Sequence, residues 1–141
     1  MIMKSPYFLN VDLDIESNTP LRSLAREWGD NVVILFSGRM KGRYYLHVEC
    51  EGANRNQDAT LNALCALVEG LSVDAKRVWD AARVKEFNLG YDTRFSSQDA
   101  KYNYLRIRSG TLRRIARLGA SVAVTLYREE DPIKRAPRTP R

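Results

Sequence analysis

A strand, helix, strand pattern occurs twice in this chain of 141 residues. The first copy covers residues 13–37 and the second covers residues 105–127, and they align when one residue is dropped beside Pro20 and one beside Trp28. Apolar strand positions, a helix start and a helix-ending glycine recur at matching places. Such a duplicated packing unit constrains the fold much more than the chemistry, because neither copy contains a reactive set of side chains.

The repeat predicts one α+β domain with a ferredoxin-like arrangement, in which two βαβ repeats build a mostly antiparallel sheet with helices on one face. Alternating apolar and polar residues predict the strands, and caps and glycines mark the helix ends. Thr19 is the expected cap of the first helix, Asp58 of the second and Ser72 of the third. We expect strands at residues 7–15, 32–36, 44–51, 86–93, 102–108 and 121–127, and helices ending near Gly29, Gly70 and Gly119.

The charge is unevenly distributed along the chain. The formal net charge is +6, yet residues 100–141 contain eleven Lys and Arg against three Asp and Glu. The final ten residues, PIKRAPRTPR, contain too few apolar side chains to repay the cost of ordering. We therefore expect a single domain over residues 1–131 and a disordered basic tail over residues 132–141.

Two sequence features indicate a cytoplasmic protein. No apolar run reaches the length of a membrane span, and acidic residues follow the N-terminus too closely for a secretory signal. Cys50 and Cys65 fall on the apolar sides of a strand and a helix, so we expect buried, reduced thiols. Trp28 and Trp79 lie on apolar helix faces and are expected in the core.

Three carboxylates in the first strand, Asp12, Asp14 and Glu16, invite a metal or acid/base interpretation. The repeat offers an alternative, because its second copy places Arg106 and Arg108 at the positions of Asp14 and Glu16. If the first strands of the two copies lie side by side and antiparallel, the acidic and basic rows form ion pairs across the strands. We expect this pairing and no metal site.

The sequence gives no specific support for an enzyme. His47 is the only histidine and is expected on the polar face of its strand, whereas Cys50 points to the opposite face. Neither common glycine-rich phosphate-binding motif occurs. We therefore predict no catalytic set and no cofactor, and we retain His47 only as a candidate binding residue.

Positive charge in the second copy favours contact with an anionic partner. Residues 106–117 contain no acidic residue, and Tyr104 precedes them on the expected strand. Aromatic side chains on an open sheet face are one way in which proteins stack the bases of single-stranded RNA. The RNA-recognition pattern of glycines and aromatics is absent. The candidate binding residues are Tyr104, Arg106, Arg108, Arg113, Arg114 and Arg117, together with His47.

At LRRIARLGASVAVTLY, residues 112–127, the chain resembles the closing helix and strand of small uncharacterised bacterial domains, some of which are similar to immunity proteins of toxin systems. The resemblance implies a bacterial cytoplasmic protein that works by binding another protein. It assigns no functional residue. The basic C-terminal third departs from the acidic character that is common among inhibitors of nucleases.

These observations predict a non-enzymatic binding protein that uses an exposed sheet face or the arginine-rich last helix. RNA or DNA binding through the C-terminal third is the alternative, and it predicts an affinity that falls steeply with salt. A ligand-sensing or dimerising module is a third class. A protein partner is favoured, a nucleic acid and a homodimer stay open, and no membrane contact is expected.

Overall fold

The fold was taken from a computed structural model, in which residues 7–52, 56–92 and 105–127 are described. The predicted tail at residues 132–141 and residues 102–104 of a predicted strand lie outside this part of the chain. In chain order the elements are β1 (Tyr7–Ser17), α1 (Arg22–Trp28), η1 (Gly29–Asn31), β2 (Val32–Met40), β3 (Arg43–Cys50), α2 (Gln57–Glu69), α3 (Val73–Ala81), β4 (Val84–Asp92), α4 (Ser109–Arg117) and β5 (Ser121–Tyr127).

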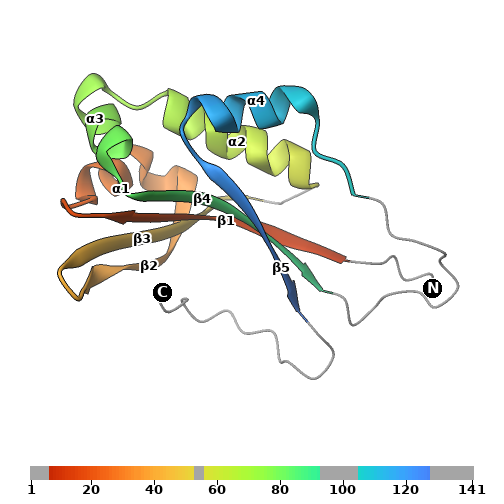
Figure 1. The fold of residues 1–141 in the computed structure, drawn as a ribbon, viewed down its shortest axis with the longest axis horizontal. Coiled ribbons are helices and arrows are strands. Elements are labelled where there is room, and N and C mark those ends of the chain that lie inside the picture. Colours follow the sequence, from red (N-terminus) through yellow and green to blue (C-terminus); the bar gives the residue numbers. More distant parts are fainter. Residues whose placement is uncertain (1–6, 53–55, 93–104, 128–141) are drawn as a thin grey trace, which may run out of the picture.

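The described strands form one five-stranded mixed sheet in the order β2-β3-β1-β4-β5, and the four α-helices gather on one side of it (Figure 1). The pairs β2–β3, β3–β1 and β1–β4 are antiparallel, whereas β5 pairs parallel with β4. The α+β class is therefore confirmed. The mixed sheet does not confirm the ferredoxin-like arrangement of two βαβ repeats.

Alternation along β1 divides the sheet into two faces. Val11, Leu13 and Ile15 point to the helices and are 0–1% exposed, while Asp12 and Asp14 point to the opposite side, here called the open face. A strand turns successive side chains to opposite faces, so this pattern places β1 at the centre with its apolar row against the helices. The same rule assigns the faces of the paired strands.

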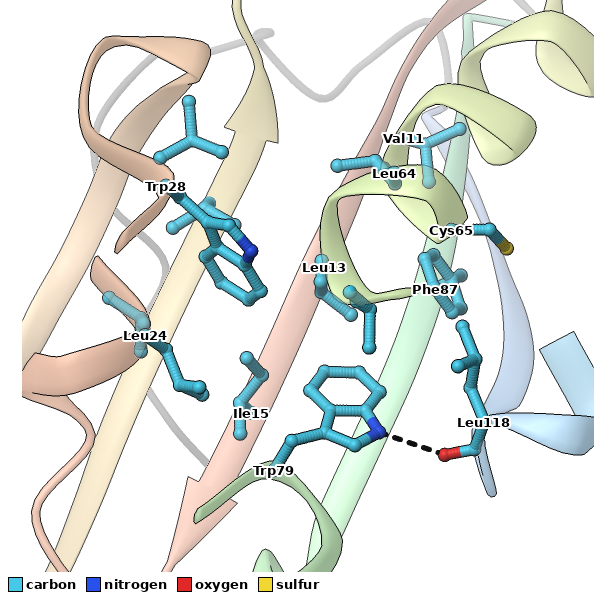
Figure 2. Close-up of a cluster of buried hydrophobic side chains, with 14 of the residues drawn as sticks. Val11, Leu13, Ile15, Leu24, Trp28, Leu64, Cys65, Trp79, Phe87 and Leu118 are labelled. Carbon is cyan, nitrogen blue, oxygen red and sulfur yellow. Dashed lines mark hydrogen bonds between the residues drawn. The ribbon is translucent and has the colours of Figure 1, made fainter. Parts of the chain in front are cut away.

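The core lies between the helix side of the sheet and the inner sides of α1–α4. Trp28 and Trp79 are buried within it, as predicted, at 3% and 0% exposure. Figure 2 shows the indole of Trp79 in this cluster, with its nitrogen 2.9 Å from the carbonyl oxygen of Leu118 just after α4. This bond satisfies both polar groups inside the core, so Trp79 ties α3 to the end of α4.

Helix caps follow the sequence rules with shifts of a few residues. Ser72 caps α3 as predicted, because its hydroxyl accepts from the backbone N–H of Ala75. Asn56, rather than Asp58, caps α2. Helix α1 begins at Arg22 without a side-chain cap. Thr19 does not serve as the cap, because the N-cap position is Leu21. The backbone N–H of Thr19 donates to Ser17 Oγ at 3.2 Å in a local turn.

Strands β2 and β3 form a hairpin, and the connection between them is shorter than the gap between the strands expected at residues 32–36 and 44–51. Strand β2 continues to Met40, and the two residues Lys41 and Gly42 reverse the chain with φ values of +53° and +79°. Positive φ at both central positions is the geometry of a tight two-residue hairpin turn.

In the structure, the two segments that were aligned as copies have only the order helix, glycine, strand in common. Gly29 after α1 and Gly119 after α4 both have positive φ, as expected for helix-ending glycines. The predicted strand at 102–108 is wrong in its described part, because Leu105–Arg108 has no strand structure. Strands β3 and β4 pair with the two edges of β1, so no edge of β1 is left for the segment Leu105–Arg108.

Both cysteines are free thiols, and Cys65 is fully buried while Cys50 is partly buried. Burial raises the pKa of Cys65 to about 11. Among the described helices, none is long and apolar enough to cross a membrane.

Candidate interaction surface

Helix α4 is amphipathic, and its packing decides which side chains remain outside. Thr111 and Ile115 are buried against the rest of the helical layer at 3% and 2% exposure. Residues one and two positions further along the chain fall on the opposite side of the helix. That outer side therefore consists of Leu112, Arg113, Ala116 and Arg117, which are all exposed.

One predicted binding residue, Arg114, holds α4 against α2. Its Nε and Nη2 donate to the two carboxylate oxygens of Glu69 at 3.0 and 2.5 Å, and its Nη1 donates to Asn62 Oδ1 at 2.7 Å. The hydrogen bonds from Arg114 lower the pKa of Glu69, and the charge of Arg117 adds to this shift. Asn62 also donates to Thr111 at 2.9 Å. Arg114 is thus a structural contact in this fold.

The segment before α4 is fixed by the first turn of α2. Gln57 Nε2 donates to the carbonyl oxygen of Arg106 at 3.2 Å, and the backbone N–H of Arg108 donates to Asp58 Oδ1 at 2.9 Å. These bonds satisfy backbone groups that a strand would have satisfied through a neighbour. The side chains of Arg106 and Arg108 are left exposed beside the start of α4.

We call the exposed arginines and leucines of α4 and of the segment before it the arginine–leucine surface. Its two leucines are large apolar side chains with 44% and 45% of their area exposed. Within the described ranges, no carboxylate lies within 4 Å of the charged group of any of its four arginines. The surface consists of Leu105, Arg106, Arg108, Leu112, Arg113 and Arg117.

The structure separates the predicted site residues into two groups. Arg106 and Arg108 lie on the segment before α4 and Arg113 and Arg117 on its outer side, whereas His47 belongs to β3 and faces the open side of the sheet, away from the helices. Tyr104 lies outside the described residues.

His47 occupies a buried position among aromatic rings. Its ring centroid is 5.8 Å from that of Phe36 and 6.5 Å from that of Tyr45, and 6% of the residue is exposed. Its Nδ1 lies 3.6 Å from Asp14 Oδ1. In the described part of the chain, aromatic packing and this carboxylate surround the imidazole.

The predicted ion pairs between the first strands of the two copies are wrong. Glu16 accepts from Arg43 Nη1 at 2.8 Å, and Asp14 faces His47. Both partners lie on β3, which occupies the edge of β1 where the second copy was expected. Arg106 and Arg108 belong to the opposite layer, because they precede α4.

The open face is acidic. Within the described part of the chain, no group of three or more His, Cys, Asp or Glu side chains is arranged to hold a metal ion. Asn10 donates through its amide to Glu49, one of these carboxylates. The acidic side chains of this face are Asp12, Asp14, Glu16, Glu49, Glu86 and Asp92.

Sequence reasoning missed the contribution of Leu105 and Leu112. The alternation of Leu105 with Arg106 was assigned to a strand with an inward apolar side, so its exposure was not expected. The exposure of Leu112 could have been predicted from the sequence, because Leu112 follows the buried Thr111 by one position and shares a helix side with Ala116.

Comparison with known proteins gave no match to the chain among family models, curated proteins or solved structures.

Proposed function

We propose that this protein is a non-enzymatic binding protein that recognises an acidic protein partner through the arginine–leucine surface. The observation that carries the proposal is the exposure of four arginines and two leucines along α4 and the segment before it. Arginine is frequent in the energetic centres of protein interfaces, where apolar contacts exclude water around it.

Part of this arrangement is electrostatically unfavourable in the isolated chain. Arg113 and Arg117 stand four residues apart on α4, where like charges repel each other. Arg108 lies at the N-terminal end of the same helix, where a cation is unfavourable. An acidic partner would remove both penalties on binding.

A nucleic acid is the second candidate partner, because exposed arginines also bind phosphates. The two leucines favour a protein instead, since apolar side chains gain nothing from contact with phosphate. Leu112→Ala separates the candidates: it weakens binding to a protein and leaves binding to RNA or DNA nearly unchanged.

The test is an affinity purification from cells of the source organism with tagged wild type and the charge-reversal variant R106E/R113E. Neither residue forms a described ion pair, so the fold should persist. R22E/R83E, on α1 and just before β4, changes the net charge equally at two exposed arginines that form no described ion pair, and it serves as the matched control. The expected result is a partner retained by wild type and R22E/R83E and lost from R106E/R113E. Equal retention by all three proteins would remove the proposal.

Two finer predictions belong to this proposal. We place the protein in the cytoplasm, which the free thiols of Cys50 and Cys65 support. We also propose that β1–β4 with α1–α3 form a ferredoxin-like unit to which α4 and β5 are added, because those four strands are antiparallel in the order β2-β3-β1-β4. The relation to immunity proteins stays a prediction.

A further inference from the structure

In the part of the chain that the structure describes, strand β5 is an edge strand without the usual protection against pairing. Within the described sheet it pairs with β4 alone, in unbroken register from Ser121 to Tyr127. Its sequence, SVAVTLY, contains no charged residue and no proline. Natural edge strands usually carry a charge, a proline or a bulge, because an open edge is a template for another strand.

The opposite edge shows the expected protection. Strand β2 has a register shift between Ile34 and Phe36 and carries Arg39. The two edges of one sheet therefore differ, and β5 is the one that is left suitable for pairing.

An apolar row accompanies the open edge. Val122, Val124 and Leu126 lie on the helix side of the sheet and are 37%, 56% and 55% exposed. Their neighbours on β4, including Phe87 and Leu89, are fully buried. The cover provided by the helices therefore ends at β4, and the row on β5 is a contiguous apolar strip.

The strip is complementary to itself. If two copies of β5 pair antiparallel about Val124, Val122 of each chain faces Leu126 of the other. On the other side of the sheet Ala123 faces Thr125, and no like charges meet anywhere along the strand. A two-fold axis requires such reciprocal contacts, in which one patch binds the same patch of a second copy.

We infer that two copies of this chain associate by antiparallel pairing of their β5 strands, joining the two sheets into one. The occupant of the edge is a second copy, because self-pairing places the exposed apolar side chains of β5 against equally apolar ones and brings no like charges together. No residue of β5 belongs to the arginine–leucine surface, so this inference stands independently of the proposed function.

The test is sedimentation equilibrium of the full chain with three substitutions. Wild type is expected to be a dimer at micromolar concentration. V124K places two lysines face to face at the two-fold axis and should weaken the dimer roughly a hundredfold. I34K makes the same change at a 50% exposed position on β2 and should leave the dimer intact.

A mixture of V124K and V124E restores a lysine opposite a glutamate and should recover a heterodimer. Circular dichroism melting of each variant verifies folding, which a change at a half-exposed side chain should preserve. The inference is overturned if wild type is monomeric, if V124K dimerises as strongly as wild type, or if I34K weakens the dimer as much as V124K does. A mixture that stays monomeric would also contradict it.

Discussion

The guanidinium of Arg114 on α4 donates two hydrogen bonds to the carboxylate of Glu69 on α2, from Nε at 3.0 Å and from Nη2 at 2.5 Å. This pair fixes the helix that presents the arginine–leucine surface. It also shows why an arginine-rich segment cannot be treated as uniform: one of its members holds the fold, and others remain outside.

Removing this contact should lower stability in a pH-dependent way. A double-mutant cycle of R114A and E69Q is expected to give a coupling free energy of about 1 kcal/mol at neutral pH, modest because both side chains are partly exposed. Arg114 lowers the pKa of Glu69 from its ordinary 4.5. The coupling is therefore fully present above 4.5 and is lost as the pH falls through the depressed folded value. Urea unfolding at several pH values measures it, and a coupling that grows in acid would be inconsistent with the pair.

Trp79 should be costly to replace because of its buried hydrogen bond. In W79F the carbonyl oxygen of Leu118 loses its donor inside the core, which costs about 1–3 kcal/mol in the free energy of unfolding. W28F is the comparison, since the Trp28 indole donates to Leu67 in a less buried setting. Denaturant unfolding should show the larger loss for W79F. Equal stability of W79F and wild type would show that the bond contributes nothing.

Two glycine substitutions should change stability in opposite directions. G42A places a Cβ at φ +79° in the hairpin turn and should destabilise the protein by about 1 kcal/mol. G110A lies in the first turn of α4, where an added Cβ meets nothing within 4 Å, and should stabilise by roughly 0.5–1 kcal/mol. Thermal melting distinguishes them; the same sign for both would contradict the assigned backbone geometry.

The thiol of Cys65 should be inert in the native protein. Burial raises its pKa to about 11, so almost no thiolate exists at pH 8, and the side chain is fully enclosed. In the variant C50A, which leaves Cys65 as the only cysteine, Ellman's reagent should react only as fast as the protein unfolds. Labelling within seconds under native conditions would show that the site is open to solvent.

Local patterns were sufficient for the elements whose determinants lie close in sequence. The alternation in β1, the Ser72 cap of α3 and the glycines after α1 and α4 all follow from neighbouring residues. The alternation of Leu105 and Ile107 misled because strand pairing is a long-range property. Nothing near these residues indicates that β3 and β4 already occupy both edges of β1, or that Gln57 and Asp58 take the backbone bonds of this segment.

The candidate surface could be predicted in part for the same reason. Its arginines are evident as a run without acidic residues. The structural role of Arg114 depends on Glu69, 45 positions away, and the partners Arg43 and His47 of the first-strand carboxylates come from a strand that local patterns did not place beside β1.

Site-specific photo-crosslinking from α4 tests the central claim most directly. A photoreactive amino acid at position 112 lies within the arginine–leucine surface, and the same group at position 73, where Val73 on α3 is 71% exposed, is the control. The account predicts one protein crosslinked from position 112, absent from position 73, and lost when R106E/R113E is added. The same crosslinks from both positions, or a crosslink unaffected by R106E/R113E, would contradict it.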